Sequence, residues 1–323
     1  MAQVDRRDFL LAAGGLLVAP AFARQSSRVY TVGVLFGGAE ESMAIYRAAL
    51  VKRLAKHGFV EHRNLRIEAR TSHFGFSNTV RELVALKPDA LLSCTTIGTL
   101  DAKGAAGSTP IVFAWVPDPT AAEFVHSYAR PGGNITGVTN RFGELLIKRL
   151  ELAREMFPTA RRVAVSGFPV GEYGRLVAPL RRAAETFGVE LVEFPPYDWG
   201  ACVEQAKAAG AAALIPIIQF TANGLHVSGE AVIKAAFEHR VPVIFAGAEM
   251  VEAGGLVSYG TNLVDDIRRA ADLLARVLKG ADPATIPVDQ AARFELVVNL
   301  KTAKAIGITI PRSIVLRADR VIE

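Results

Sequence analysis

The chain has 323 residues, half of them hydrophobic, and carries a formal net charge of +5. A chain of this length is too long for one hydrophobic core, so we expect two lobes. Its Lys and Arg residues are spread evenly, without the basic stretch that marks a nucleic-acid surface, so nucleic acid is not an expected partner.

The first 23 residues predict an export signal. Arg6-Arg7-Asp8-Phe9-Leu10 precedes a short apolar run, and Ala21-Phe22-Ala23 has the small-x-small form of a cleavage site. The twin arginines favour the Tat route over the Sec route. The apolar run is about a dozen residues, shorter than the ~20 of a spanning helix, and no cysteine stands at the cleavage site to carry a lipid. We therefore expect residues 1–23 to be removed and the mature protein to be soluble and periplasmic.

From residue 29 onward, short β-branched runs alternate with helical patterns, as in βαβ units on a parallel sheet. The predicted strands of the first half are 29–36, 65–70, 90–94 and 111–115, with helices at about 42–57 and 80–86. The turn-rich stretch 130–137 predicts a lobe boundary or the approach to one. A helix at about 144–156 and strands at 162–166, 190–194, 213–218, 243–246 and 256–259 follow. The expected fold is α/β, with two doubly wound parallel-sheet lobes.

In such sheets a ligand binds beyond the carboxyl ends of the strands, where helix amino termini and loop amides meet. The first lobe offers three such positions: Phe36, Gly37 and Gly38; Thr95, Thr96 and Ile97; Asp118 and Pro119. Glycines let backbone amides approach a ligand, threonine hydroxyls suit a carboxylate, and Asp118 suits an ammonium or hydroxyl group. Asp118 and the two threonines are equally compatible with capping the helices that follow them.

The second lobe offers Phe168, Gln219, Glu249 and Tyr259 at equivalent strand ends. The two rings can cover an apolar or planar part of a ligand, or belong to the core. The six histidines are scattered, and the chain has neither a nucleophile elbow nor a phosphate-binding loop. We predict no catalytic residue, metal or cofactor. The cysteines, Cys94 and Cys202, are expected to be buried inert thiols, with a single disulfide between them as the alternative.

Longer motifs carry a resemblance to a known family. They are Val32-Gly33-Val34-Leu35, His57-Gly58-Phe59-Val60-Glu61, Thr109-Pro110-Ile111-Val112-Phe113, the segment 130–138 (RPGGNITGV), the segment 252–260 (EAGGLVSYG) and the segment 294–304 (FELVVNLKTAK). Together they resemble the ABC-transporter substrate-binding proteins whose named members bind tryptophan or phenylalanine. The resemblance covers nearly all of the mature chain.

The resemblance implies a type I periplasmic-binding-protein fold with a three-stranded hinge. Lobe 1 would comprise residues 28–139 and about 262–285, and lobe 2 residues 140–261 and about 286–323. One small molecule would lie between the lobes, and the closed form would dock on an ABC permease, which is the only contact with the membrane. The chain departs from the family pattern at 166–169 (SGFP), where Asn-Pro is common, and at 217–219 (IIQ), where a polar Asp or Asn is often seen.

An aromatic or branched amino acid is the leading ligand, with other small organic solutes open. A periplasmic enzyme is the main alternative, and it predicts abnormal titration of Glu249 or Asp118 and turnover of the ligand. A ligand sensor without transport is a second alternative. A LacI-like regulator would need a DNA-binding module before the first strand, where we expect only the export signal.

Overall fold

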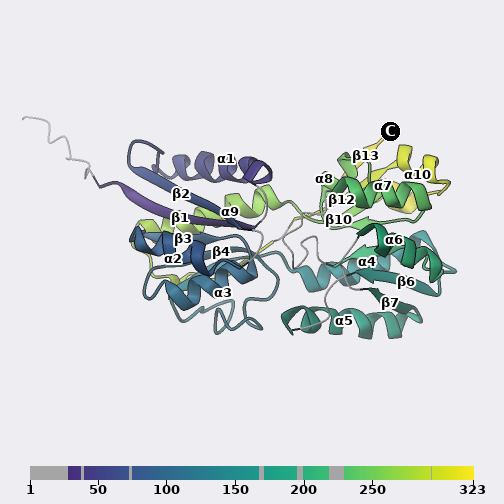
Figure 1. Ribbon diagram of the computed structural model, residues 1–323, viewed down its shortest axis with the longest axis horizontal. Helices are drawn as coiled ribbons and strands as arrows, with labels where there is room; N and C mark the ends of the chain where they lie inside the picture. Colours follow the sequence, from purple (N-terminus) through teal and green to yellow (C-terminus); the bar gives the residue numbers. More distant parts are fainter. Residues whose placement is uncertain are drawn as a thin grey trace, which may run out of the picture.

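Two α/β lobes lie side by side along the long axis of the molecule (Figure 1). The computed structural model describes residues 28–37, 40–72, 75–166, 171–194, 199–217, 229–291 and 293–323. The predicted export segment lies outside the described residues, as do Gly38, Phe168 and Gln219. The alternation of strands and helices predicted from the sequence is confirmed, and so is the α/β fold class.

The first lobe has a six-stranded parallel sheet in the order β11-β5-β4-β3-β1-β2. Its strands are β1 (Tyr30–Gly37), β2 (Leu65–Ser72), β3 (Ala90–Ser93), β4 (Ile111–Val116), β5 (Ile135–Thr139) and β11 (Asp289–Gln290). Helices α1 (Glu40–Lys56) and α9 (Leu263–Leu278) cover one face, and α2 (Ser77–Ala85) and α3 (Thr96–Ala105) cover the other. Because both faces are covered, the strands read as continuous apolar runs.

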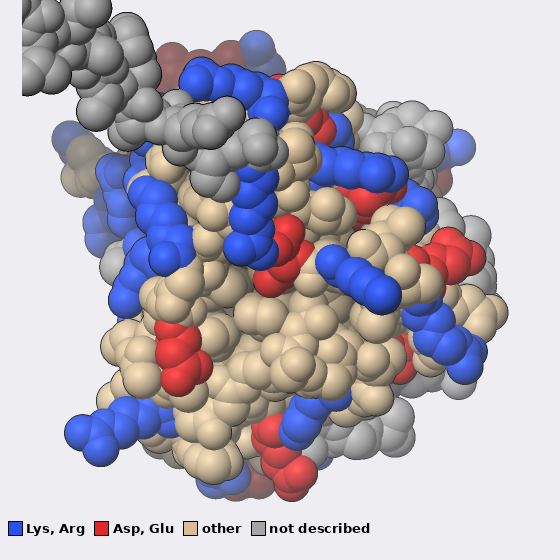
Figure 2. Space-filling view, turned by 90° about the vertical axis from the view of Figure 1, so that its left-hand side faces the viewer, with Lys and Arg blue, Asp and Glu red and all other residues tan. Residues whose placement is uncertain are grey.

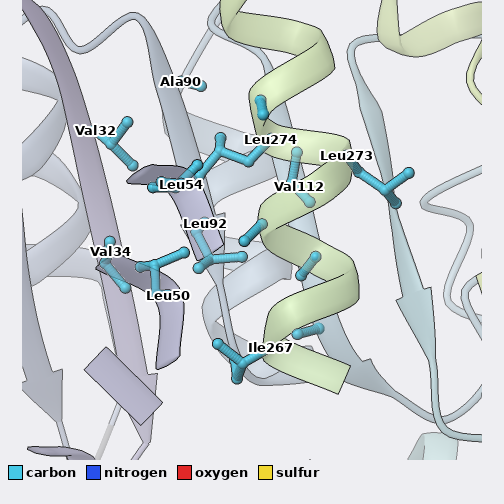
Figure 3. Close-up of a cluster of buried hydrophobic side chains, with 14 of the residues drawn as sticks. Val32, Val34, Leu50, Leu54, Ala90, Leu92, Val112, Ile267, Leu273 and Leu274 are labelled. Carbon is cyan, nitrogen blue, oxygen red and sulfur yellow. The ribbon is translucent and has the colours of Figure 1, made fainter. Parts of the chain in front are cut away.

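Helix α9 ties a late part of the chain to the first lobe. Its apolar residues recur at intervals of three and four, and Ile267 and Leu274 point toward Leu50 and Leu54 of α1 and toward the sheet (Figure 3). Ile267 and Leu274 are fully buried. The core of the first lobe therefore includes a helix that returns from beyond residue 260.

The second lobe contains two sheet segments in the orders β7-β6-β8 and β13-β12-β10-β9, joined by a bridge between Leu214 and Val243. Its strands are β6 (Arg162–Ser166), β7 (Glu190–Phe194), β8 (Leu214–Pro216), β9 (Ile244–Phe245), β10 (Val257–Thr261), β12 (Phe294–Asn299) and β13 (Arg320–Ile322). The pairing of β10 with β12 is antiparallel, whereas the others described in this lobe are parallel.

Helices cover both faces of the second sheet as well. One side carries α4 (Phe142–Met156), α5 (Gly171–Phe187), α10 (Leu300–Ile306) and α11 (Arg312–Arg317). The other carries α6 (Trp199–Ala208), α7 (Gly229–His239) and α8 (Ala248–Glu252), and the short η1 (Pro283–Thr285) belongs to the first lobe. Both lobes are therefore doubly wound.

Within the described residues, the chain passes between the lobes three times. The crossovers run from Thr139 to Phe142, from Thr261 to Leu263 and from Gln290 to Phe294. The third follows β11, which pairs with β5 in the first sheet, so it lies a few residues beyond the expected boundary near 286. The amide N–H of Ala291 donates to the carbonyl of Thr139 at 3.0 Å and ties the third crossover to the first.

The turn-rich stretch comes directly before the first crossover, and strand β5, which the sequence did not predict, begins inside it. Gly137 serves close strand packing, since a Cβ there would lie 2.3 Å from the carbonyl oxygen of Phe113. No helix begins near Thr120; residues 119–123 form a turn instead.

Both cysteines are buried thiols in the cores of different lobes, and no disulfide joins them. Burial raises the pKa of the Cys94 thiol well above its usual value. The Ser166 hydroxyl donates to the sulfur of Cys202 at 3.3 Å. The expectation of buried thiols is confirmed, and the alternative of a disulfide between them is wrong.

The end of the first lobe that faces away from the second is shown in Figure 2. On the described part of this face, basic side chains gather over the upper half with acidic ones among them, and an area just below the centre carries neither. This face has no continuous basic surface.

Candidate functional site

The ends of β1 and β3 lie in contact at the edge of the first lobe. A Cβ at Gly37 would lie 2.7 Å from the Thr95 methyl carbon, so a side chain at this position would collide with Thr95. Phe36, predicted as a ligand contact, is 1% exposed and packs in the core. Only the backbone of this strand end is available to a ligand.

Thr95 is the N-cap of α3. Its Oγ1 accepts from the N–H of Gly98 at 2.9 Å, and the Thr99 hydroxyl donates to its carbonyl at 2.7 Å. Thr96 is buried, whereas the side chain of Ile97 is exposed. The structure therefore gives Thr95 the capping role, while its hydroxyl hydrogen and the first amides of α3 remain at the carboxyl edge of the sheet.

Asp118 is occupied by its own loop. Its Oδ1 accepts from the N–H of Thr120 at 3.1 Å and from that of Ala121 at 2.9 Å, and Pro119 is buried. The structure therefore supports a capping role for Asp118, although its carboxylate caps a turn and not a helix.

Tyr259 lies at the hinge. Its ring packs at 6.2 Å from that of Phe294, and its carbonyl accepts from Nε of Arg149 at 2.8 Å. The ring is half-buried against the core of the second lobe. Tyr259 in β10, which precedes the second crossover, therefore contacts Phe294, which follows the third.

Two aromatic residues form a corner at the same edge of the first lobe. Tyr46 of α1 meets Trp115 of β4 edge to face, with ring centroids 4.8 Å apart and an angle of 71° between the rings. Neither residue was selected from the sequence. The available signals were the position of Trp115 at a strand end and that of Tyr46 near the start of the helix after β1.

Glu249 lies in the first turn of α8 in the second lobe. Its side chain is exposed. The pKa of Glu249 is nevertheless raised, mainly because the surrounding protein desolvates the carboxylate. A hydrogen bond from its own N–H lowers the pKa, and the negative charges of Glu252 and Glu295 raise it further.

The charge of Glu249 reaches across to the first lobe. Burial raises the pKa of Tyr46 to about 12, and Glu249 is the second cause. Tyr46 of the first lobe and Glu249 of the second are therefore near enough for the charge of one to act on the other. Among the described residues, no Lys, Arg or His forms an ion pair with Glu249.

Two surface hollows lie away from this site. One of about 420 Å³ lies between α7 and α10 on the outside of the second lobe, and one of about 220 Å³ lies beside the first turns of α9. Neither is lined by Tyr46, Trp115 or Glu249. We place the candidate site at the interlobe position because strand ends and opposing side chains converge there.

The described part of the chain contains no cluster of three or more His, Cys, Asp or Glu side chains able to hold a metal ion. Nor does any described helix have the length and apolar character required to cross a membrane. The carboxylate of Glu249 accepts no hydrogen bond from a described serine, cysteine or histidine side chain.

The profile of a family described as ABC transporter substrate binding protein matches residues 32–322. The chain belongs to this family. The match extends across both lobes and all three crossovers, and it agrees with the resemblance carried by the sequence motifs.

Two of the three similar proteins named here are described with an amino acid. A tyrosine-binding protein of Clostridioides difficile is 25% identical over 266 residues, which cover 80% of this chain and 76% of that protein. A conserved domain protein of Vibrio cholerae has a structure with a TM-score of 0.81 and 26% identity, covering 91% of this substrate-binding protein and 100% of that chain. A Streptococcus pneumoniae domain in complex with L-Trp gives a TM-score of 0.79 at 24% identity, with coverage of 91% and 100%.

Proposed function

We propose that this substrate-binding protein is a periplasmic receptor that binds an amino acid or a related small organic solute between its lobes and delivers it to the permease of an ABC importer. Residues 1–23 would direct its export by the Tat route. The ligand would favour a closed form that the permease recognises. The observation that carries the proposal is the family match over residues 32–322, which spans both lobes and all three crossovers.

The chemistry of the site suits an amino acid. Glu249 offers a carboxylate without a described cationic partner, which suits an ammonium group. The amides at the start of α3 and the Thr95 hydroxyl suit a carboxylate, since a helix amino terminus favours negative charge. These assignments move the ammonium contact from Asp118, whose Oδ1 is engaged locally, to Glu249.

An enzyme would show abnormal titration of Glu249 or Asp118 and turnover of the ligand. The first of these is met, because the pKa of Glu249 is raised. Desolvation between two lobes accounts for that shift without any catalytic role. Catalysis would also require a nucleophile or a proton-transfer partner beside the carboxylate. We therefore favour a receptor, for which the ligand leaves unchanged; a sensor without transport would bind the ligand in the same way.

Thermal unfolding of the mature chain against single amino acids and small organic acids tests the proposal. A ligand that binds only the folded state adds about 2.7 kcal/mol at a hundredfold excess over Kd, which raises the midpoint by several degrees. We expect a rise for one chemical class and recovery of the ligand intact after long incubation. Conversion of the ligand would establish the enzyme, and no rise with any compound would contradict an amino-acid receptor.

A further inference from the structure

Trp115 adopts a backbone conformation that large side chains rarely take. Its φ is +60°, in the left-handed region, and the pairing of β4 with β5 shifts register between Ala114 and Val116. Trp115 is thus the extra residue of a bulge, a feature that re-aims a side chain and is frequent beside active sites. Such strain persists where the surrounding structure holds it.

The indole of Trp115 is incompletely satisfied. The ring is half-buried against the first-lobe core, with the edge-to-face contact to Tyr46. Its Nε1 is buried and has no hydrogen-bond acceptor among the described residues. A buried indole N–H normally has an acceptor, because leaving a donor unpaired is unfavourable.

The position of Trp115 directs it toward the interlobe site. Val116, the next residue, pairs with Thr139, where the first crossover begins. Its ring partner Tyr46 is the side chain whose pKa responds to Glu249 of the second lobe. The strained bulge, the unpaired N–H and the facing carboxylate are independent features of one place.

We propose that Trp115 contacts the ligand: its ring packs on the solute's carbon skeleton, and a rotation of the indole on binding brings its Nε1–H, buried without an acceptor in this structure, to an acceptor oxygen of the solute. This inference rests on the proposed receptor function and adds a specificity residue to it. With Glu249 on the opposite wall, the site would select solutes that carry both an oxygen acceptor and a cationic nitrogen. An amino acid would then bind more tightly than its decarboxylated amine.

Fluorescence tests the contact without altering Trp115. The chain has two tryptophans, Trp115 and Trp199, so Trp199→Phe leaves Trp115 as the single indole. We expect its emission to shift on titration with the non-fluorescent ligands found by thermal unfolding, with the Kd measured by calorimetry. The matched variant Trp115→Phe, which keeps Trp199, should lose most of this signal.

The hydrogen bond is tested by affinity. Trp115→Phe keeps an aromatic ring and removes the N–H, so Kd for the amino acid should rise about tenfold, with less than a twofold change for the matching amine. Tyr46→Phe, which keeps the edge-to-face ring contact, is the control and should change the two Kd values equally.

Calorimetric binding with silent Trp115 emission, or an equal loss for amino acid and amine in Trp115→Phe, would overturn this inference and leave the receptor function standing. Absence of binding by the wild-type chain to every compound would overturn the receptor function and this inference together. If Trp115→Phe does not fold, the emission of Trp199→Phe still decides the contact.

Discussion

Glu249 and Asp118 are both acidic residues near strand ends, but their surroundings assign them different roles. The Asp118 carboxylate accepts two backbone N–H groups of its own turn. The Glu249 carboxylate lies between the lobes, where desolvation raises its pKa. A charge kept in such a place without a described cation is available to a cationic ligand group.

We expect Glu249→Gln to weaken binding of an ammonium-bearing ligand about tenfold to a hundredfold, the effect of losing a hydrogen bond to a charged group. Because the pKa of Glu249 is raised, lowering the pH protonates it earlier than an ordinary glutamate. Wild-type affinity should therefore fall at mildly acidic pH, and the affinity of the variant should stay flat. Calorimetry across pH measures both.

Glu252→Gln is the matched control, since Glu252 lies on the same helix but pairs with Arg320. It should leave ligand affinity near neutral pH unchanged. Because the charge of Glu252 contributes to the raised pKa of Glu249, the fall in affinity should persist in this variant but begin at a lower pH. Equal weakening by the two variants would mean that the general negative charge of α8 acts on the ligand, and not a contact with Glu249.

The turn after β4 illustrates how a local cap positions a loop. Besides the two bonds to Asp118, the N–H of Phe124 donates to the carbonyl of Pro119 at 2.9 Å, which closes the turn that precedes the buried pair Phe124 and Val125. Capping bonds of this kind contribute about 1 kcal/mol.

Asp118→Ala should accordingly lower the free energy of unfolding by about 1 kcal/mol, because two backbone N–H groups lose their acceptor. Ligand affinity of the folded protein should change less than threefold. Urea unfolding and calorimetry on the same preparation separate the two effects. Unchanged stability with a large loss of affinity would return Asp118 to the ligand site.

At the level of elements, the sequence predicts what depends on local pattern. The β-branched runs that became β1, β4 and β6 were found within a few residues, because buried parallel strands are continuously apolar. Strand β5 is not predicted, because Gly137 in the sequence suggests a turn, whereas in the structure it allows close packing against Phe113. The Tyr46–Trp115 corner was missed because it depends on a strand bulge and a contact between residues almost seventy positions apart.

At the scale of the whole molecule, the hinge holds ionisable groups in buried positions. Arg149 is 1% exposed, stacks over the ring of Phe142 and donates to Tyr259, and burial lowers its pKa to about 9. Asp266 in α9 is 2% exposed and accepts from the Thr261 hydroxyl at 3.0 Å. Tyr259 and Thr261, which precede the second crossover, are thus hydrogen-bonded to the buried side chains of Arg149 and Asp266.

The environment of Asp266 sets a pH dependence. Burial raises its pKa to about 7, the bond from Thr261 and the charge of Arg269 oppose the rise, and Asp265 and Asp289 add to it. Arg269 is itself bound to Asp289 and to the carbonyl of Gln290, beside the third crossover. Arg53 and Arg293 line the same groove as Asp266.

Since the pKa of Asp266 is higher in the folded chain than in the unfolded one, the folded state binds more protons between about pH 4 and about pH 7. The free energy of unfolding should therefore fall as pH rises through this window, by up to about 4 kcal/mol from this group, and level off above it.

Asp266→Asn keeps the shape of the side chain without its charge. In urea unfolding, the free energy of unfolding of this variant should match that of the wild type near pH 4 and exceed it near pH 8. Asp265→Asn, at a partly exposed position paired with Arg268, is the control: its free energy of unfolding should still fall with rising pH, with the window moved to slightly lower pH because the charge of Asp265 adds to the raised pKa of Asp266. A constant difference between Asp266→Asn and the wild type across the window would mean that Asp266 stays ionised in the folded protein. In that case Arg269 and Thr261 compensate its burial, and the hinge is insensitive to pH at this position.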